Sequence, residues 1–301
     1  MSGDPFDWQA VYPAGVSRSL DMPDATLGDL LAASARRRGG AAAFSMPEGE
    51  LTYAGLLTAA RRRARGLAPG ERVLLTEPNG GSFVESAFAA YLAGALLVPI
   101  APDAPPALVD ELRRDAAAPG AVADGPPRPE DLAVLQYTSG TTGGRKAAAM
   151  THRNLVANAL QNDTWFGWTP DDVILGALPL CHTWGLSCVL HATVLAGARA
   201  VLLPEFHAER VIAAIERERV TVAYGSATMF HRLLDAAGDR AERVFASLRY
   251  VKAGAMLVGG DLPERWAAAV PGVPMVLGYV LTEAAPEVCN NPPAAPRAGT
   301  V

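Results

Sequence analysis

A run of hydroxyl side chains and glycines that ends in a lysine is the part of the chain best suited to chemistry. The run covers residues 137–146 and reads YTSGTTGGRK. Glycines let backbone N–H groups approach an anion closely. Hydroxyl groups donate hydrogen bonds to phosphate oxygens, and a lysine adds a point charge. The run therefore predicts a loop that binds a polyphosphate.

The residues around Lys146 disfavour a phosphate loop of the Walker type. That motif needs glycine before the lysine and serine or threonine after it, whereas this chain has Arg145 and Ala147. The hydroxyl group that holds magnesium in such loops would therefore be missing. A flexible surface loop is the plain alternative, but the run contains three glycines and four serine or threonine hydroxyls between a predicted strand and a predicted helix.

Cysteine and histidine form no nucleophilic or zinc-binding pattern. The three cysteines, Cys181, Cys188 and Cys289, lack CxxC spacing, so we expect free thiols rather than a disulfide framework or a zinc cluster. Cys181 is adjacent to His182 in sequence, which does not by itself bring the two side chains together. A thiol nucleophile is therefore not predicted.

The elements that position the loop alternate between buried strands and amphipathic helices. This alternation of strands and helices is typical of mostly parallel sheets that are covered on both faces. The loop follows a strand predicted over 133–138 and precedes a helix predicted over 151–162. The segment 117–130 is rich in Ala, Pro and Gly and predicts a linker. We expect an α/β fold with two βαβ-type lobes, 1–116 and 131–301.

Length, charge and composition exclude other classes of protein. Half of the 301 residues are hydrophobic, so the chain can bury a large core and is not disordered. Lys plus Arg number 26 against 31 Asp plus Glu, a net charge of −5, which argues against a nucleic-acid binder. The N-terminus lacks a signal-peptide pattern, and the longest apolar run, 87–102, is broken by Gly94 and Pro99. We expect a cytoplasmic protein with no membrane span.

The loop resembles the signature of the adenylate-forming enzymes, which include acyl-CoA synthetases, adenylation domains of non-ribosomal peptide synthetases and luciferases. Their pattern is Y-T-S-G-T-T-G-x-P-K-G, from which this chain departs at Arg145 and Ala147. Four more segments resemble family motifs in the same order: LPLCHTWG at 178–185, VTVAYGSAT at 220–228, LRYVKAGA at 248–255 and GYVLTE at 278–283. The N-terminal half looks most like medium- and long-chain fatty acyl-CoA synthetases.

This resemblance implies a two-step ligase reaction. A carboxylate attacks the α-phosphate of ATP and gives an acyl-adenylate and pyrophosphate, and the acyl group then passes to a thiol. The implied cofactors are ATP and Mg²⁺, and the implied acyl acceptor is coenzyme A or a carrier-protein thiol. The oligomeric state is not implied.

The resemblance also assigns the nucleotide site. It implies phosphate-binding roles for Thr138, Ser139, Gly140, Thr141, Thr142, Gly143 and Lys146. It places Gly254, Ala255, Gly278, Tyr279 and Thr282 around the nucleotide, with Tyr279 stacked on the adenine. Glu283 is the implied magnesium ligand. The plain alternatives are a core aromatic for Tyr279 and a surface acid for Glu283.

The remaining implied roles concern catalysis and the binding of the carboxylic-acid substrate. The implied catalytic residues are Thr282, Glu283, His182 and Lys146, and His182 would orient the carboxylate. The implied pocket walls are His182, Trp184, Met229 and Phe230. A structural role for His182 and ordinary helix packing for the other three stay open.

Two parts of the family pattern have no counterpart in these 301 residues. They are a T-G-D motif that binds the ribose and a small C-terminal domain that carries a catalytic lysine. We therefore expect the large N-terminal AMP-binding domain of a truncated acid–thiol ligase. One alternative is a nucleotide-binding pseudoenzyme or a fragment that needs a partner. Another is a relative that activates an unusual acid in secondary metabolism, to which the departures at Arg145, Ala147, Cys181, Ala227 and Val280 point.

Overall fold

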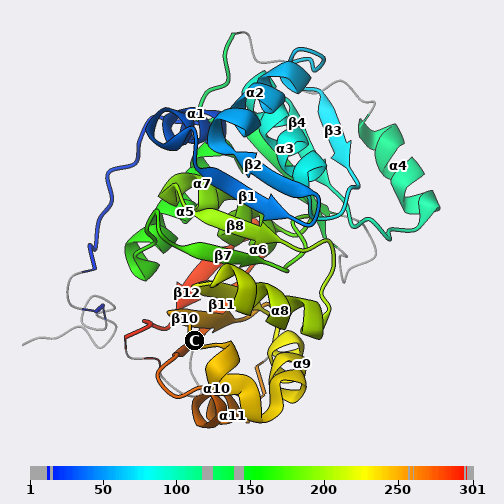
Figure 1. Cartoon of the computed structure of the whole chain (residues 1–301). Coiled ribbons are helices and arrows are strands. Elements are labelled where there is room, and N and C mark those ends of the chain that lie inside the picture. Colours follow the sequence, from blue (N-terminus) through cyan, green and yellow to red (C-terminus); the bar gives the residue numbers. More distant parts are fainter. Residues whose placement is uncertain are drawn as a thin grey trace, which may run out of the picture.

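Two β-sheets with helices packed on them make up the protein (Figure 1). The computed structural model describes residues 12–13, 16–116, 125–138, 146–256, 258–259, 261–294 and 296. In the described part of the chain, one sheet has eight strands and the other has four. The predicted α/β fold is confirmed.

The eight-stranded sheet has a parallel centre and antiparallel edges. Its order is β12-β11-β10-β9-β7-β8-β1-β2, and the antiparallel pairs are β1 with β2 and β11 with β12. Its inner strands are short and buried, as expected for a parallel sheet with both faces covered. The strands are β1 Ala42–Met46, β2 Gly49–Thr52, β7 Val173–Gly176, β8 Arg199–Leu202, β9 Val222–Gly225, β10 Tyr250–Ala253, β11 Met275–Val280 and β12 Glu287–Asn290.

The four-stranded sheet has the order β3-β4-β5-β6. β3, β4 and β5 are parallel, and β6 is antiparallel to β5. These strands are β3 Arg72–Leu75, β4 Leu96–Pro99, β5 Leu132–Thr138 and β6 Lys146–Thr151. Each sheet contains strands from both sides of the segment 117–130, so the two sheets do not coincide with lobes 1–116 and 131–301.

Alternate residues of the central strands enter two different cores, because side chains of a strand point to opposite faces. Val222 and Tyr250 belong to the core toward α1, α5 and α7, whereas Ala223 and Val251 belong to the core toward α8, α9 and α11. The helices are α1 Leu27–Arg38, α2 Tyr53–Ala64, α3 Gly81–Ala93, α4 Pro106–Ala116, α5 His152–Phe166, α6 Thr183–Gly185, α7 Ala192–Ala196, α8 Ala208–Glu218, α9 Ala227–Ala237, α10 Ala241–Val244 and α11 Leu262–Ala269.

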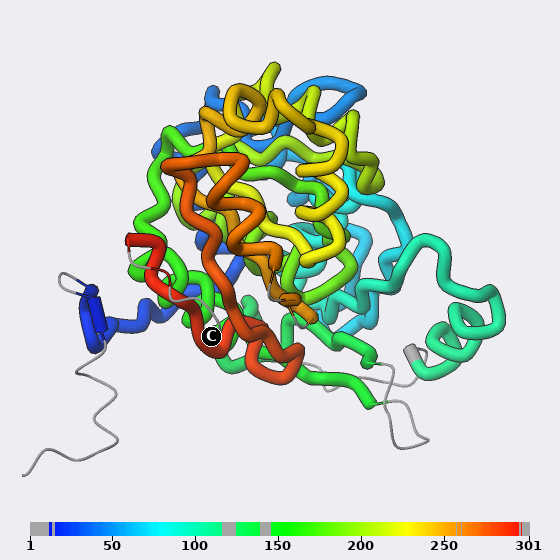
Figure 2. The backbone as a smooth tube through the Cα atoms, turned by 90° about the horizontal axis from the view of Figure 1, so that it is seen from below, coloured from blue at the N-terminus to red at the C-terminus, as the bar shows by residue number. Residues whose placement is uncertain are grey.

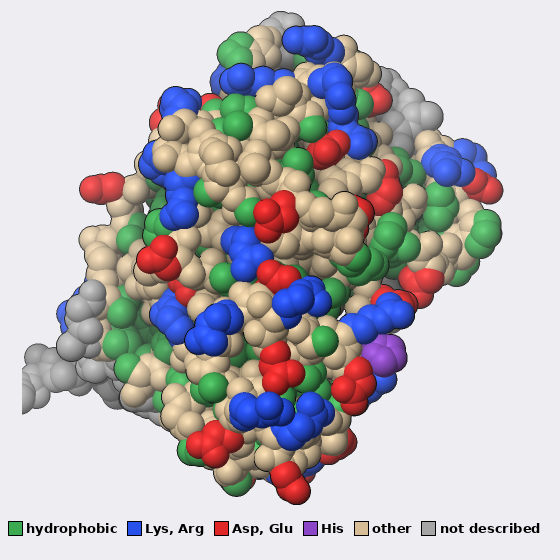
Figure 3. All heavy atoms as spheres, viewed as in Figure 1, with side chains coloured by type: hydrophobic (Ala, Val, Ile, Leu, Met, Phe, Trp, Pro, Cys, Tyr) green, Lys and Arg blue, Asp and Glu red, His purple; other side chains and the backbone are tan. Residues whose placement is uncertain are grey.

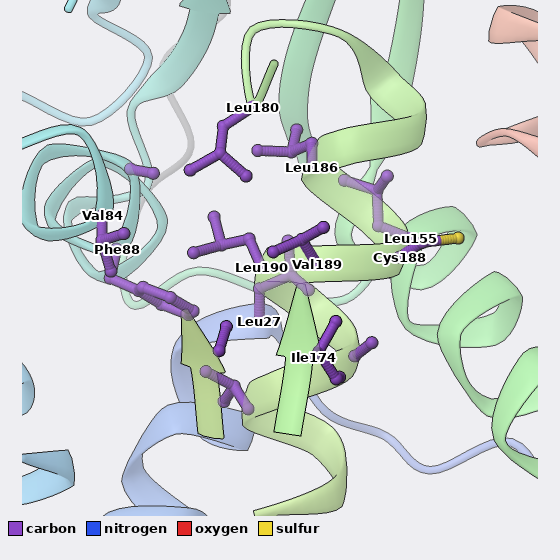
Figure 4. Packing of buried hydrophobic residues seen from close by; sticks show 14 of the residues in the cluster. Leu27, Val84, Phe88, Leu155, Ile174, Leu180, Leu186, Cys188, Val189 and Leu190 are labelled. Carbon is purple, nitrogen blue, oxygen red and sulfur yellow. The ribbon is translucent and has the colours of Figure 1, made fainter. Parts of the chain in front are cut away.

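The first of these cores is continuous between the two sheets. Figure 4 shows Val84 and Phe88 of α3 close to Leu190, with Leu27 of α1 and Ile174 of β7 in the same cluster. Leu75 and Leu97 of the small sheet belong to it as well. The two sheets are therefore held against each other by shared apolar burial, the dominant favourable term in folding.

Two helical features are unusual. α1 begins with a capping box, in which Thr26 and Asp29 exchange side-chain and backbone hydrogen bonds. The helical segment after His182 contains a π-helix at Leu186–His191. π-helical turns inside helices frequently occur at functional sites.

The phosphate loop does not run from a strand into a helix as predicted. Residues 146–151 form β6, which pairs antiparallel with β5, and Thr138 lies opposite Lys146. The loop therefore joins two neighbouring strands, and α5 starts only at His152. Ala147, where the family has glycine, is an ordinary strand residue opposite Tyr137.

A helix before the linker was also not predicted. α4 ends at Ala116, directly before the predicted linker, and it stands out from the side of the molecule in both views (Figures 1 and 2). Basic and acidic side chains are interspersed over the face shown in Figure 3. No helix within the described ranges is long and apolar enough to cross a membrane.

Two buried histidines predict that the protein loses stability in acid. His152 and His191 flank Tyr91, whose hydroxyl lies 3.1 Å from His191 Nε2. Burial lowers the pKa of His152 to about 4 and that of His191 to about 3. Both imidazoles are neutral in the folded state, whereas the unfolded chain binds protons below its ordinary pKa of about 6.5. Stability is therefore lost as the pH falls from about 6.5 toward 4.

Urea unfolding at pH 7.5 and pH 5 measures this loss. We expect each histidine to contribute about 2 kcal/mol to the difference in the free energy of unfolding. His191→Gln should shrink the difference, whereas the same change at the exposed His207 should not. Equal pH dependence in the two variants would rule the explanation out.

Candidate functional site

A cavity of about 760 Å³ lies where strands of both sheets end. Its walls include Thr138 at the end of β5, Ala255 after β10 and Val280 at the end of β11. The segment after β7, ending in His182 and Trp184, forms another wall. The carboxyl ends of parallel strands are where α/β proteins usually bind their ligands. α4 closes one side with Leu108 and Leu112.

The cavity brings together five residues that the sequence assigned to a site. Thr138, His182, Trp184, Ala255 and Thr282 all line it, although they come from four separate motifs. Ala255 has φ 63°, a left-handed conformation that costs a non-glycine residue of order 1 kcal/mol or more. Such strained residues cluster at functional sites.

Gly254 and Gly278 lie beneath this wall. A Cβ atom at Gly254 would lie 2.9 Å from the carbonyl oxygen of Gly278 and 3.4 Å from Trp184 Cη2. A Cβ at Gly278 would overlap Lys252 Cε. Close packing therefore requires glycine at both positions. This requirement could not be inferred from the nucleotide-binding role that the sequence predicted for them.

Glu283 opens onto a different hollow from its neighbour Thr282. The turn Thr282–Ala284 after β11 directs Thr282 into the cavity, whereas Glu283 lines an adjoining hollow of about 340 Å³ with Asn154, Asn158 and Gln161. The Glu283 side chain is exposed. Mg²⁺ commonly takes one or two carboxylates together with phosphate oxygens and water, and a single accessible carboxylate fits that requirement.

The residues expected to hold phosphate are only partly described. Ser139, Gly140, Thr141, Thr142 and Gly143 lie outside the described residues. At the base of the loop, Thr138 Oγ1 donates to the carbonyl oxygen of Lys146 over 3.4 Å. The Lys146 side chain is exposed. The loop therefore starts at the cavity wall and returns to an accessible lysine.

His182 lines the cavity and is exposed to solvent. Burial lowers the pKa of its imidazole, and the negative charge of Asp103 partly opposes this. The ring is therefore neutral near pH 7 and can donate one hydrogen bond and accept another. Cys181, beside it, also lines the cavity, and burial raises its pKa to about 11, so the thiol stays protonated.

Tyr279, Phe230 and Met229 also lie outside the cavity wall. Tyr279 of β11 is 49% exposed and sits opposite Cys289, so its ring is free to stack on a ligand. Phe230 is buried against Trp266, with ring centroids 5.5 Å apart. Met229 is packed between the two cores. α9 contributes Phe230 to the core toward α8 and α11, and neither Met229 nor Phe230 lines the cavity.

Two polar groups at the cavity were not predicted. Gln136 Oε1 and Thr183 Oγ1 are buried and have no hydrogen-bond partner among the described residues. Both residues line the cavity. A buried polar atom without a partner costs about 1–3 kcal/mol, so a ligand that supplies partners would gain from them. Tyr137, also in the wall, donates to Asp115 of α4.

No group of three His, Cys, Asp or Glu side chains that could hold a metal ion occurs in the described part of the chain.

Gly185 predicts a strong packing effect next to His182 and Trp184. A Cβ there would lie 2.9 Å from the carbonyl carbon of Pro179 and would overlap its oxygen. Because backbone atoms cannot move aside easily, we expect Gly185→Ala to lower the free energy of unfolding by about 3 kcal/mol. Gly40→Ala, where nothing lies within 4 Å of the new Cβ, is the control. Similar urea midpoints for both variants would contradict this packing argument.

Most of the chain matches known proteins. A family profile described as "AMP-binding enzyme" matches residues 31–124 and 108–301. A feruloyl-CoA synthase from Amycolatopsis sp. is 34% identical over 294 residues of alignment, with 85% of this chain and 57% of that protein covered. The chain thus spans little more than half the length of this curated relative.

Two solved structures share the fold. A long-chain-fatty-acid-CoA ligase (FadD1) from Archaeoglobus fulgidus superimposes with a TM-score of 0.81 at 23% identity, over 94% of this chain and 69% of that one. ATP-bound MatB from Rhodopseudomonas palustris superimposes with a TM-score of 0.76 at 25% identity, over 90% of this chain and 63% of that one. This chain therefore shares its fold with a fatty-acid-CoA ligase and with MatB.

Proposed function

Because the chain belongs to the family of AMP-binding enzymes, we propose that its cavity binds ATP beside a carboxylic acid and joins them as an acyl-adenylate. The observation that supports this is the convergence of Thr138, His182, Ala255 and Thr282 on one cavity from four motifs. The acyl group would then pass to coenzyme A. Coenzyme A is favoured over a carrier-protein thiol because the feruloyl-CoA synthase relative is named for a CoA product.

The acid end of the site is formed by His182 and Trp184. A neutral imidazole can donate a hydrogen bond to a carboxylate without fixing it as tightly as a charged one would. The carboxylate oxygen attacks the α-phosphorus, a new P–O bond forms, and the bond to the pyrophosphate oxygen breaks. Positioning and charge stabilisation supply most of the catalysis in phosphoryl transfer of this kind.

The nucleotide end is formed by the glycine-rich strands and the loop. The exposed Tyr279 ring would stack on adenine, and Thr282 would donate its hydroxyl to the α-phosphate. Lys146 and the loop 138–143 would hold the outgoing phosphates. Glu283 would ligate Mg²⁺, which neutralises charge on the phosphates when bound.

We favour an aromatic acid as the substrate. The relative with 85% of this chain aligned is a feruloyl-CoA synthase, and Trp184 presents a large planar side chain to the cavity. Fatty acids are the second candidate, because the N-terminal half resembles fatty acyl-CoA synthetases. An unusual acid in secondary metabolism is the third.

Acid-dependent exchange of labelled pyrophosphate into ATP tests the proposal. We expect exchange with aromatic acids such as ferulate, and weaker exchange with straight-chain fatty acids. Exchange with fatty acids alone would replace the aromatic assignment. Binding of ATP with no exchange for any acid, with a partner chain absent, would contradict the proposal and favour a nucleotide-binding pseudoenzyme or partner-dependent fragment.

A further inference from the structure

A buried ion pair lies directly behind the acid end of the cavity. Lys252, in the middle of the large sheet, has a side chain that is 0% exposed, and its ammonium group contacts the carboxylate of Glu287, whose side chain is 4% exposed. A fully buried charge is unfavourable unless it is paired and hydrogen-bonded. Neither residue is part of the activation chemistry described above.

Further contacts hold both members of the pair. Glu287 Oε1 accepts a hydrogen bond from Cys188 Sγ at 3.1 Å. The Glu287 backbone is held by Asn158, whose Nδ2 donates to the Glu287 carbonyl oxygen at 3.0 Å and whose Oδ1 accepts from the Glu287 N–H at 3.3 Å. On the other side, Lys252 Nζ lies 5.6 Å from the centre of the Phe166 ring. The pair is therefore fixed on both sides.

The same pair contacts the cavity wall from behind. Lys252 Nζ lies 5.5 Å from the centre of the Trp184 ring, a distance at which a cation is attracted to an aromatic face. Pro286, the residue before Glu287, lines the cavity together with Trp184. Neither wall residue can withdraw without disturbing the buried charges.

The space behind this wall is filled. Tyr224 packs edge-on against Trp184, with ring centroids 6.4 Å apart. The sheet below has no spare room, because a Cβ at Gly278 would overlap Lys252. A long acyl tail could therefore pass Trp184 only by separating the ion pair.

We propose that the Lys252–Glu287 ion pair is a positioning device that fixes the Trp184–Pro286 wall and makes the acid end select a planar acid over one with a long flexible tail. This inference rests on the proposed function. Lys252 and Glu287 act through Trp184 and Pro286 and do not touch the substrate. Without the pair, Trp184 would lose its anchoring cation and could rotate to admit a longer chain.

The test removes both charges together. Replacing a buried ion pair with apolar residues of similar volume is often neutral for stability or favourable, so Lys252→Met combined with Glu287→Leu should fold. The ratio of the dissociation constants for cinnamate and dodecanoate is measured by calorimetry on the full chain in the presence of ATP. The half-buried pair Arg199–Glu218 supplies the control, as Arg199→Met with Glu218→Gln.

We expect the wild-type preference for cinnamate to fall at least tenfold in the Lys252–Glu287 double variant, with ATP affinity unchanged and with no change in the control. An unchanged ratio in the folded double variant would overturn this inference and leave the proposed function standing. If neither acid bound to the wild type, the proposed function would fail, and the inference with it.

Discussion

Lys252→Met is expected to lower the free energy of unfolding by about 3–5 kcal/mol, because it leaves the Glu287 carboxylate buried without its cation. Within the described ranges, only Cys188 would still donate to that carboxylate, and a thiol is a weak donor. Urea unfolding followed by circular dichroism measures the loss. This is the largest stability effect that we expect from a single substitution near the cavity.

The partner substitution and the double variant make this prediction specific. Glu287→Leu should cost a similar amount, because it leaves the Lys252 ammonium group buried. The double variant should recover most of the loss, so the two single effects should be strongly non-additive. Additive losses would show that each side chain contributes through packing alone and that the pair is not an energetic unit.

Glu283→Ala is expected to lower acid-dependent pyrophosphate exchange by about 100-fold, the size of effect seen when one stabilising group is removed from a charged transition state. Glu283 is the accessible carboxylate beside Thr282, and Mg²⁺ that loses its protein ligand would screen the phosphates less well. Exchange should also need a higher Mg²⁺ concentration to reach half of its maximum.

Glu216→Ala is the matched control for that experiment. Glu216 is an exposed carboxylate on α8, far in sequence from every residue of the cavity wall. It should leave exchange and its Mg²⁺ dependence unchanged. An equal rate for the Glu283 variant would show that this carboxylate does not hold the metal.

The convergence of the motifs could be predicted because it follows from topology. The segments that begin at Leu178, Leu248 and Gly278 each contain or follow a buried strand, and the ends of parallel strands meet at one edge of a sheet. The sequence could not show that Thr282 and Glu283 open onto separate hollows. That depends on the turn after β11, which is set by how β12 pairs back onto it.

The missed elements have weak local signals. β6 reads KAAAMT, and alanine, lysine and methionine do not favour strands. Its pairing with β5 supplies the stability that its own residues lack. α4 begins at a proline. Its apolar face packs on the small sheet, where Leu112 is buried with Leu96, Val98 and Leu135, and Leu108 and Leu112 also line the cavity.

Lys252 could not be recognised from the sequence for a different reason. A lysine is expected to reach solvent, since lysine is almost never buried unless paired. Its partner, Glu287, is 35 residues further along the chain and belongs to a strand that the sequence did not predict. The ion pair could be recognised only from the pairing of β10, β11 and β12.

Calorimetric titration of the chain with ATP and Mg²⁺ tests most directly whether this cavity is a nucleotide site. We expect saturable binding at one site, competition by AMP, and loss of binding when Thr282→Trp places a large ring in the cavity wall. Absence of saturable binding would show that the cavity is not a nucleotide site, as would binding that the Thr282 variant leaves unchanged.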